Sequence, residues 1–419
     1  MADTTSTHRP TEELLADADS IFPGRSSGSY AVPAWMQDVV FDHGEGSRLY
    51  TTEGDAYLDY ILGSGPLILG HAHPHVVAAV QEQAPRGSTF YALNEPVIRL
   101  GRMIVDAAPC AERVMFASTG AEATYLALRL ARGFTGRDYV LRFAGGYHGH
   151  HDYASTQSAG VPRATAATVL TATFNDLASV EAQFAAHPSE IAAVIVEPLH
   201  RVVQPEPGFL AELARMTREA GALLIFDEVV TGFRLAWGGG QEFYGVTPDL
   251  ATYGKIIGGG YPVSAICGRS DVMDQADPRR GGQAGYVFIS GTLSGNPIGA
   301  AAGLATLTEL AQPGAHERLN HAGERLRAGF NVAAEEFDLP LEMLGEGAVN
   351  GVVTKTDGGN APDTATALLP RLGRALFERG IASNLGKVYV SLAHSDADLD
   401  ETVRGYVEAL DQVKRELTR

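Results

Sequence analysis

Two continuous apolar runs constrain the fold of this 419-residue chain more than any other feature. AAVIVEP (residues 192–198) and ALLIFDEVV (residues 222–230) are short and rich in branched aliphatic side chains. Such runs are typical of parallel strands that are buried on both faces. The segments RVMFA (113–117) and YVLRF (139–143) predict two more strands, and the amphipathic segment GAEATYLALRLAR (120–132) predicts a helix after the first of them. Strands that alternate with helices indicate an α/β domain with a mainly parallel sheet flanked by helices.

Both ends of the chain show a different pattern of predicted helices and strands. A short helix is expected over 11–18 and a β-hairpin over 48–60, which turns at Glu53-Gly54-Asp55. Beyond about residue 300, predicted helices at 315–337, 364–379 and 395–417 alternate with strands at 351–355 and 387–392. We therefore expect an N-terminal segment (1–60) that packs with a smaller C-terminal α+β domain (306–419), and a large domain (61–305) between them.

The composition narrows the class of partner. The net charge is −18 and no long basic run occurs, so nucleic acid and anionic membranes are poor partners. The N-terminus is polar, and no apolar run approaches the roughly 20 residues that span a bilayer. The two cysteines, Cys110 and Cys267, fit a reducing compartment. We expect a cytoplasmic protein that acts on small molecules.

Acidic residues close both apolar runs, and a lysine follows them. Glu197 ends the first run, Asp227 lies near the end of the second, and Lys255 comes 28 residues later in YGKIIGGGYPVSA. Ligands of parallel sheets bind at the carboxyl ends of the strands, so all three side chains could face one cleft. Each acid could instead cap a helix, and the lysine could be a surface cation. A lysine amine among glycines can also serve as a nucleophile toward carbonyl groups.

Two loops carry further candidates. Ser118, Thr119, Gly120 and Ala121 precede the predicted helix, where free amides suit a phosphate, although an ordinary N-cap explains the same residues. The loop after 139–143 reads GGYHGHHDY, so that Tyr147 could lie on a planar ligand. Its three histidines lack the usual spacing of metal ligands, and no metal is expected.

Six motifs together resemble the class III aminotransferases, which are fold type I pyridoxal phosphate enzymes and include glutamate-1-semialdehyde aminomutase and the β-amino-acid aminotransferases. The resemblance covers about residues 35–415. The motifs stand in the family's order: STGAEA (118–123), GGYHGHHDY (145–153), VIVEP (194–198), LLIFDEVVTGFR (223–234), YGKIIGGGYPVSA (253–265) and SGTLSGNP (290–297).

The resemblance implies a role for each matching residue. Lys255 matches the lysine that forms a Schiff base with pyridoxal 5'-phosphate, and Asp227 matches the acid that pairs with the pyridine nitrogen. The resemblance implies cofactor contacts also for Ser118, Thr119, Gly120, Ala121, Tyr147, His148, Glu197 and Val229. Val229 is expected on the strand of Asp227, under one face of the ring, and Tyr147 on the other face. Thr292 matches a threonine that reaches the phosphate of a neighbouring subunit, which implies a homodimer.

The sequence departs from the aminomutase pattern before the first hairpin. A Gly-Gly-Val-Asn-Ser-Pro-Val-Arg segment is typical there, whereas this chain has PGRSSGSYAVPAWM (23–36). Tyr30 and Trp35 make the region more apolar, and Arg201 is a candidate for a substrate carboxylate. We therefore favour an aminotransferase that acts on an amine or amino acid with a carbonyl acceptor. The alternatives are an aminomutase, which moves the amino group within one molecule, and a catalytically silent binding protein.

Overall fold

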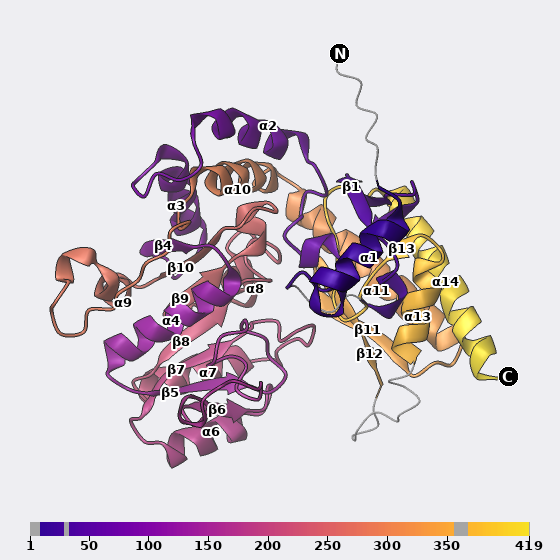
Figure 1. The fold of residues 1–419 in the computed structure, drawn as a ribbon. Helices are drawn as coiled ribbons and strands as arrows, with labels where there is room; N and C mark the ends of the chain where they lie inside the picture. The colour runs from indigo at the N-terminus through magenta and orange to yellow at the C-terminus, as the bar shows by residue number, and fades with distance from the viewer. Residues whose placement is uncertain (1–8, 29–32, 356–367, 419) are drawn as a thin grey trace.

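The computed structural model describes residues 9–28, 33–355 and 368–418. One body contains a seven-stranded sheet with helices on its faces, and both ends of the chain build a second, smaller body beside it (Figure 1). The smaller body holds a four-stranded sheet in the order β1 (Phe41–Glu45), β2 (Arg48–Thr51), β3 (Ala56–Asp59) and β13 (Ile381–Ala382). It also holds a three-stranded sheet in the order β11 (Leu341–Glu346), β12 (Val349–Thr354) and β14 (Val388–Tyr389). This arrangement confirms the expected α/β class with a smaller α+β unit formed by the chain ends.

The large sheet has the strand order β4-β10-β9-β8-β7-β5-β6. β10 runs antiparallel to both of its neighbours, and the pairs from β9 to β6 are all parallel. Its strands are β4 (Arg113–Ala117), β5 (Tyr139–Phe143), β6 (Val169–Ala172), β7 (Ile191–Val196), β8 (Leu223–Asp227), β9 (Leu250–Tyr253) and β10 (Ser264–Gly268).

The two apolar runs form the centre of this sheet, and their side chains alternate between its faces. Ala193 and Ile195 of β7 pack into the same core as α4 (Gly120–Thr135), whereas Val194 and Val196 pack toward α7 (Phe209–Glu219). Successive side chains point to opposite faces of the sheet, and both faces are covered, so every residue of β7 and β8 is buried. The burial explains why the sequence shows continuous apolar runs instead of an alternation with polar residues.

The other helices of the larger body cover the sheet or connect its strands. They are α2 (Pro74–Gln83), α3 (Glu95–Ala107), α5 (Arg163–Ala166), α6 (Leu177–Ala186), α8 (Gly239–Tyr244), α9 (Ser270–Met273) and α10 (Pro297–Leu310).

The smaller body joins residues that are far apart in the sequence. β13 (Ile381–Ala382) pairs in parallel with β3 (Ala56–Asp59), which brings the C-terminal unit against the N-terminal hairpin. Its remaining elements are α1 (Thr11–Ile21), β1 (Phe41–Glu45), β2 (Arg48–Thr51), α11 (Ala315–Glu336), β11 (Leu341–Glu346), β12 (Val349–Thr354), α13 (Leu368–Phe377), β14 (Val388–Tyr389) and α14 (Asp396–Leu417). The predicted hairpin is confirmed as β2 and β3, which pair antiparallel.

Three expectations need correction. The second apolar run was expected to continue as strand to residue 230, but β8 ends at Asp227, so Val229 lies beyond the strand. The sequence pattern also missed β11, because Gly345 and Gly347 made residues 345–351 look like a turn, whereas the turn of the β11–β12 hairpin is confined to residues 347–348. The helix expected over 364–379 ends two residues earlier than predicted, because α13 ends at Phe377. Residues 364–367 of this prediction lie outside the described residues.

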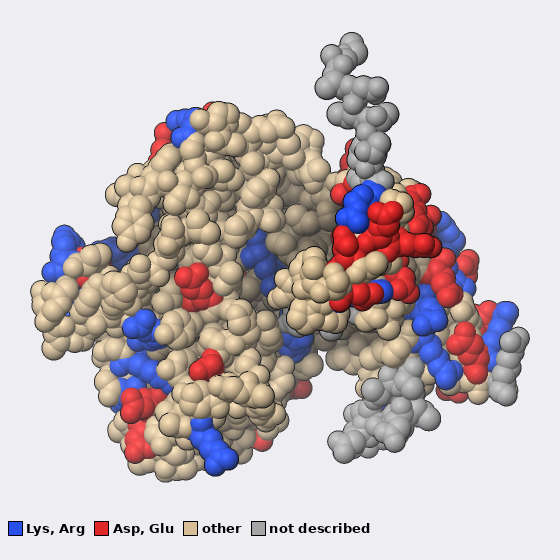
Figure 2. Space-filling view, in the orientation of Figure 1, with Lys and Arg blue, Asp and Glu red and all other residues tan. Residues whose placement is uncertain are grey.

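Charge is unevenly spread over the surface. Figure 2 shows acidic side chains gathered over the smaller body, where α1 contributes Glu12, Glu13, Asp17 and Asp19. Within the described ranges, no helix has both the length and the apolar character needed to cross a bilayer.

Candidate active site

The candidate site lies at the carboxyl ends of the two central strands. Val196 and Phe226 are register partners in the parallel pair β7–β8, and Glu197 and Asp227 are the residues that follow them. Both side chains are buried, with 5% and 4% of their surface exposed. Parallel pairing therefore sets two buried carboxylates side by side at one edge of the sheet, which is the position where ligands of such sheets bind.

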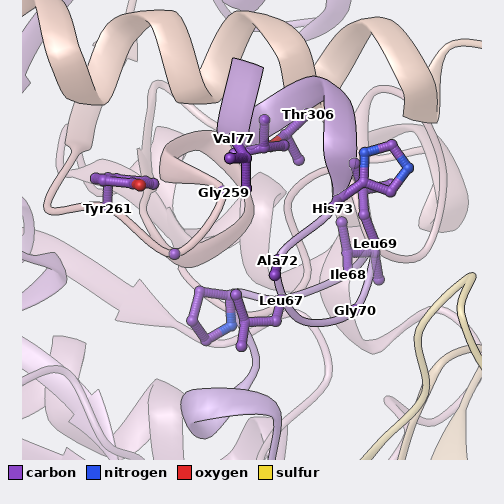
Figure 3. Close-up of a pocket in the computed structure, with 13 residues that line it drawn as sticks. Leu67, Ile68, Leu69, Gly70, Ala72, His73, Val77, Gly259, Tyr261 and Thr306 are labelled. Atoms are coloured by element: carbon purple, nitrogen blue, oxygen red, sulfur yellow. The ribbon is translucent and has the colours of Figure 1, made fainter. Parts of the chain in front are cut away.

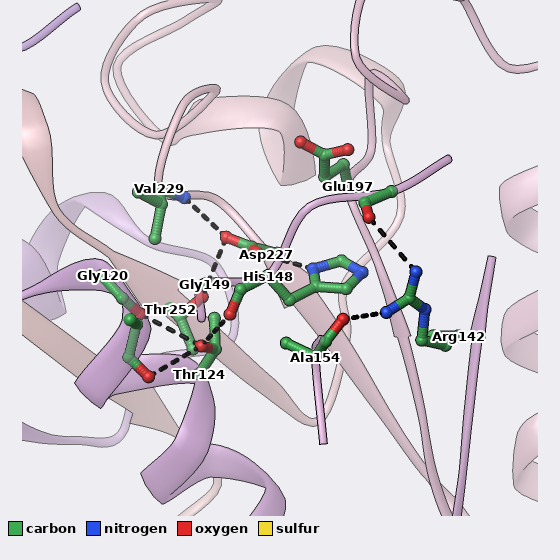
Figure 4. A network of polar contacts seen from close by, with 12 residues as sticks. Gly120, Thr124, Arg142, His148, Gly149, Ala154, Glu197, Asp227, Val229 and Thr252 are labelled. Atoms are coloured by element: carbon green, nitrogen blue, oxygen red, sulfur yellow. Dashed lines mark hydrogen bonds and ion pairs between the residues drawn. The ribbon is translucent and has the colours of Figure 1, made fainter. Parts of the chain in front are cut away.

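The Asp227 carboxylate is held by three hydrogen bonds (Figure 4). Its Oδ2 lies 2.7 Å from Nδ1 of His148, and its Oδ1 accepts from the Val229 amide at 3.1 Å and from the Thr252 hydroxyl at 3.2 Å. Thr252 lies on β9, next to β8, so the sheet itself orients the carboxylate. Asp227 is therefore fixed in position before any ligand arrives.

The loop after β5 supplies His148 and is closely packed against α4. The carbonyl of His148 accepts a hydrogen bond from the Thr124 hydroxyl at 2.5 Å, and Gly149 adopts a φ of 101°. A β-carbon on Gly149 would lie 2.5 Å from that of Ala121, so only glycine allows this approach. The buried Nε2 of His148 has no hydrogen-bond partner among the described residues.

Lys255 begins the short 3₁₀ helix that follows β9 and has a φ of 49°. A non-glycine residue rarely adopts this left-handed conformation, which is common at functional sites. Burial lowers the pKa of the Lys255 ammonium, while charge interactions with Tyr389 and Asp227 raise it and those with Lys387 and Arg234 lower it further. The neutral amine, which is the nucleophilic form, is thereby favoured.

Close backbone contacts join the start of α4 to the ends of β8 and β9. A β-carbon on Gly120 would lie 2.9 Å from Cγ1 of Val229, and one on Gly254 would lie 3.3 Å from the same atom. Gly254 directly precedes Lys255. The structure therefore gathers the α4 terminus, Asp227, Val229 and Lys255 in one place, although Val229 reaches it from a turn.

The start of α4 has features of an anion site. Thr119 is the N-cap, and its hydroxyl accepts from the Glu122 amide at 3.2 Å. The first amides of a helix have no intrahelical acceptor, so those of Gly120 and Ala121 suit a phosphate, aided by the helix dipole. Ser118 is otherwise engaged through its amide, which donates to the Glu122 carboxylate at 2.8 Å.

Glu197 organises the residues on its own side of the site. Its Oε2 accepts from the Arg201 amide at 3.3 Å, and Arg201 adopts a φ of 62°. The Arg201 guanidinium lies over the Tyr147 ring, 6.0 Å from its centre. Tyr147 itself is 42% exposed. Arg201 and Tyr147, both predicted from the sequence, are thus brought together beside Glu197.

The remaining predicted residues lie elsewhere or outside the described chain. Trp35 packs against α13, because a β-carbon on Gly373 would lie 2.3 Å from the indole ring. Thr292 is exposed in the turn before α10. Tyr30 lies outside the described residues. A substrate role for Trp35 and a cofactor role for Thr292 stay predictions.

The sequence did not indicate two residues of the site, Lys387 and Arg234. Lys387 is 9% exposed, and its Nζ lies 3.8 Å from Oε1 of Glu197. Arg234 is fully buried; its Nε donates to the Val230 carbonyl at 2.9 Å, its Nη2 donates to Gly65, and its guanidinium lies 4.8 Å from the centre of the Tyr389 ring. The TGFR motif and the lysine within the apolar segment LGKVYV were the available signals.

The histidines of the loop have partners other than a metal. His148 contacts Asp227, and Nε2 of His151 lies 3.2 Å from the Thr124 hydroxyl. Burial lowers the pKa of His151 to about 4, so it is neutral at pH 7. No group of three or more potential metal ligands occurs within the described ranges.

A cavity of about 250 Å³ lies apart from these residues (Figure 3). It is bounded by residues 66–70, 72, 73, 76 and 77, by Gly259, Gly260 and Tyr261, and by Thr306. Its only ionisable side chains are those of His73 and Tyr261, and none of the candidate site residues lines it. We therefore place the candidate active site at the strand ends and not in this cavity.

The residues at the strand ends match the groups of pyridoxal phosphate. A largely buried lysine amine is available for an aldehyde, an oriented buried carboxylate for a pyridinium nitrogen, and the amides of a helix terminus for a phosphate. Together with the mainly parallel sheet, they define an enzyme of the fold type I pyridoxal phosphate class.

Comparison with known proteins gives the family. The chain belongs to the class III aminotransferases, whose family profile matches residues 29–410. It is 44% identical to a glutamate-1-semialdehyde 2,1-aminomutase of Roseiflexus castenholzii, over 96% of this chain and 98% of the relative. A second aminomutase of that name, from Brevibacillus brevis, is 41% identical over 95% and 97%.

Solved structures agree with this family. An omega-transaminase from Sphaerobacter thermophilus superposes with a TM-score of 0.88 at 30% identity, covering 97% of this chain and 98% of that one. A beta-phenylalanine aminotransferase from Variovorax paradoxus gives 0.85 at 32% identity, with 96% and 94% covered. The chain is therefore an enzyme that uses pyridoxal phosphate and moves amino groups.

Proposed function

We propose that this enzyme transfers an amino group from an amine or amino acid to a separate carbonyl acceptor, with Lys255 as the residue that bonds to the cofactor. The observation that carries the proposal is the convergence of Lys255, Asp227 and the start of α4, joined through the contacts of Gly120 and Gly254 with Val229.

The roles follow from the chemistry of each group. Pyridoxal phosphate, when bound, withdraws electrons from the carbon that carries the amino group. Asp227, next to the pyridine nitrogen, would keep that nitrogen protonated, because a nearby opposite charge favours the charged form. Lys255, released by the incoming amine, would act as acid–base catalyst and move a proton between the substrate carbon and the cofactor. Its burial suits this role, because a lysine whose pKa is lowered accepts and releases protons nearer neutral pH.

The choice of reaction type depends on the N-terminal segment. An aminomutase must retain its intermediate while the amino group changes carbon, and so needs a closed site that holds the substrate. This chain lacks the Ser-Pro-Val-Arg element and carries Tyr30 and Trp35 in that stretch, which favours release of a carbonyl product. The aminomutase activity is the second candidate, favoured by the 41–44% identity to relatives of that name.

A stoichiometry measurement separates the two reactions. The pyridoxal form of the enzyme is mixed with candidate amines and amino acids in the absence of an acceptor, and free carbonyl product is compared with aminated cofactor. Transamination predicts equal amounts of the two and no further turnover. Conversion of glutamate-1-semialdehyde to 5-aminolevulinate over many turnovers, without an acceptor, would establish the aminomutase instead.

We further infer a homodimer in which Thr292 serves the neighbouring site. Three segments, residues 90–98, 261–262 and 288–296, carry exposed apolar side chains and are joined by hydrogen bonds. The Asn94 side chain donates to the Gly295 carbonyl at 2.9 Å, and the Asn296 side chain donates to the Pro262 carbonyl at 3.5 Å. These segments expose Phe90, Tyr91, Leu93, Ile98, Tyr261, Phe288 and Leu293. Exposed apolar surface of this extent is typical of an interface, and Thr292 lies within it.

The cellular location and the domain limits are also proposals. We propose a cytoplasmic enzyme, in line with the two unpaired, buried cysteines. We propose the domain limits 1–60, 61–305 and 306–419, which limited proteolysis can test.

A further inference from the structure

The chain contains only four lysines, and two of them lie in the candidate site. Lys255 and Lys387 are both nearly buried, whereas Lys355 is exposed and Lys414 is half-buried on α14. Burial of an ammonium is costly unless its charge is compensated, so a second buried lysine needs an explanation. The proposed mechanism uses only Lys255.

The local structure directs Lys387 into the site. It directly precedes β14, its amide donates to the Asn384 side chain at 2.9 Å, and it stands two residues before Tyr389. Residues two apart on extended chain share a side. Tyr389 packs under the Arg234 guanidinium, 4.8 Å from its ring centre, and its charge interaction with Lys255 raises the pKa of that amine. Lys387 therefore faces the same space as Lys255, Tyr389 and Arg234.

The partners of Lys387 leave most of its hydrogen-bonding capacity unused. An ammonium has three donors. Within the described residues, Nζ forms one ion pair, with Glu197 at 3.8 Å, and donates no hydrogen bond. Glu197 is itself shared, because it also accepts from the Arg201 amide and lies 3.9 Å from Nδ1 of His200. Lys387 can thus bind a further anion without losing a hydrogen bond.

The charges around this space are unbalanced. Arg234 is fully buried, forms no ion pair with a described carboxylate, and its Nη1 has no described hydrogen-bond partner. Among the described residues, Lys387, Arg234 and Arg201 form one ion pair with a carboxylate, that of Lys387 with Glu197. An anionic group on the substrate would add a counter-charge to these cations.

We propose that Lys387 binds the carboxylate of an amino-acid substrate and so makes the enzyme select amino acids over simple amines. The inference rests on the proposed function and specifies its substrate class. Glu197 holds the ammonium in place without saturating it, and Arg234 adds a fixed positive charge behind it. Because Lys387 is buried away from water, a carboxylate–ammonium contact there is stronger than in water.

Ligand binding tests the proposal without turnover. The probes are 3-phenylpropanoate and unbranched carboxylates of three to six carbons, each compared with its neutral amide by calorimetry on the holoenzyme. The wild type should bind at least one carboxylate at least about tenfold more tightly than its amide. Lys387→Met should abolish this preference, Lys387→Arg should retain most of it, and Lys355→Met, the matched exposed lysine, should leave it unchanged. A preference absent from the wild type, or intact in Lys387→Met, would overturn the proposal.

Two further variants and a kinetic measurement exclude a purely structural role. If Lys387→Met fails to fold because Glu197 is left unpaired, Lys387→Met/Glu197→Gln removes both charges and is compared with Glu197→Gln alone. With 3-amino-3-phenylpropanoate and 1-phenylpropylamine as substrates, loss of Lys387 should raise KM for the amino acid at least about tenfold and leave the amine unchanged. Equal effects on both substrates would contradict carboxylate binding. Failure of the wild type to convert any amine or amino acid with a separate carbonyl acceptor would instead contradict the proposed function.

Discussion

The imidazole Nδ1 of His148 lies 2.7 Å from Oδ2 of Asp227, and both side chains are buried. The pair joins the loop after β5 to the end of β8, so the loop that carries Tyr147 is held to the acid proposed to face the cofactor nitrogen. The Thr124 hydroxyl, which donates to the His148 carbonyl, ties the same loop to α4. One set of hydrogen bonds thereby couples the residues proposed to contact the cofactor ring to those proposed to contact its phosphate.

The first prediction concerns the charge of Asp227. Asp227→Asn keeps the size of the side chain and an acceptor for the Val229 amide, but removes the negative charge. Turnover should fall by at least about a hundredfold, which corresponds to roughly 3 kcal/mol of barrier. Steady-state kinetics of the folded holoenzyme measures it. The control is Asp249→Asn, which should retain most activity, because Asp249 precedes β9 at the end of that strand far from Asp227. Near-normal turnover of Asp227→Asn would refute the role of its charge.

The second prediction concerns the interface. Leu293→Asp places a charge among the exposed apolar side chains next to Thr292 and should shift the enzyme from dimer to monomer. Light scattering across a concentration series measures the change. Val332→Asp alters an equally apolar, exposed residue on α11 and should leave the dimer intact. A wild-type monomer with full activity would contradict the assignment.

The third prediction concerns Thr292 itself. Thr292→Ala removes the hydroxyl proposed to reach the partner's cofactor phosphate, so the affinity for pyridoxal phosphate should fall about tenfold while the dimer persists. Titration of the apoenzyme by absorbance measures the affinity. Thr308→Ala, whose hydroxyl donates to the Leu304 carbonyl within α10, serves as the control. An unchanged affinity in Thr292→Ala would exclude the contact.

The fourth prediction concerns acid stability. Burial lowers the pKa of His394 to about 4, from an ordinary value near 6.5. The unfolded chain therefore binds this proton first, and stability falls as the pH drops from about 6.5 through about 4. His394→Asn keeps an acceptor for the Ser391 amide but does not titrate. The urea unfolding midpoint should fall less between pH 7 and pH 5 in the variant than in the wild type; equal losses would contradict the assignment.

The sequence predicted the parts of the site that depend on neighbouring strands. Glu197 and Asp227 follow apolar runs, and parallel pairing places the ends of such runs together. The extent of β8 was predicted wrongly, because Val229 and Val230 continue the apolar pattern after the chain has already turned. The period of the side chains alone cannot show where backbone pairing stops.

The lysine within LGKVYV was visible in the sequence, but nothing there placed it at the site. Lys387 enters the site only because β13 pairs with β3 and β14 pairs with β12. Pairings between segments so distant in sequence leave no local pattern. Arg234 was likewise missed, because its partners are backbone carbonyls and an aromatic ring, which no spacing rule marks.

The most direct test of the central claim is to locate the covalent link to the cofactor. The holoenzyme is reduced with borohydride, digested and mapped by mass spectrometry, and only four lysines can carry the label. We expect the pyridoxyl group on Lys255, with Lys387 unlabelled although it lies in the same site. A label on Lys387, or on either of the other two lysines, would contradict the role proposed for Lys255.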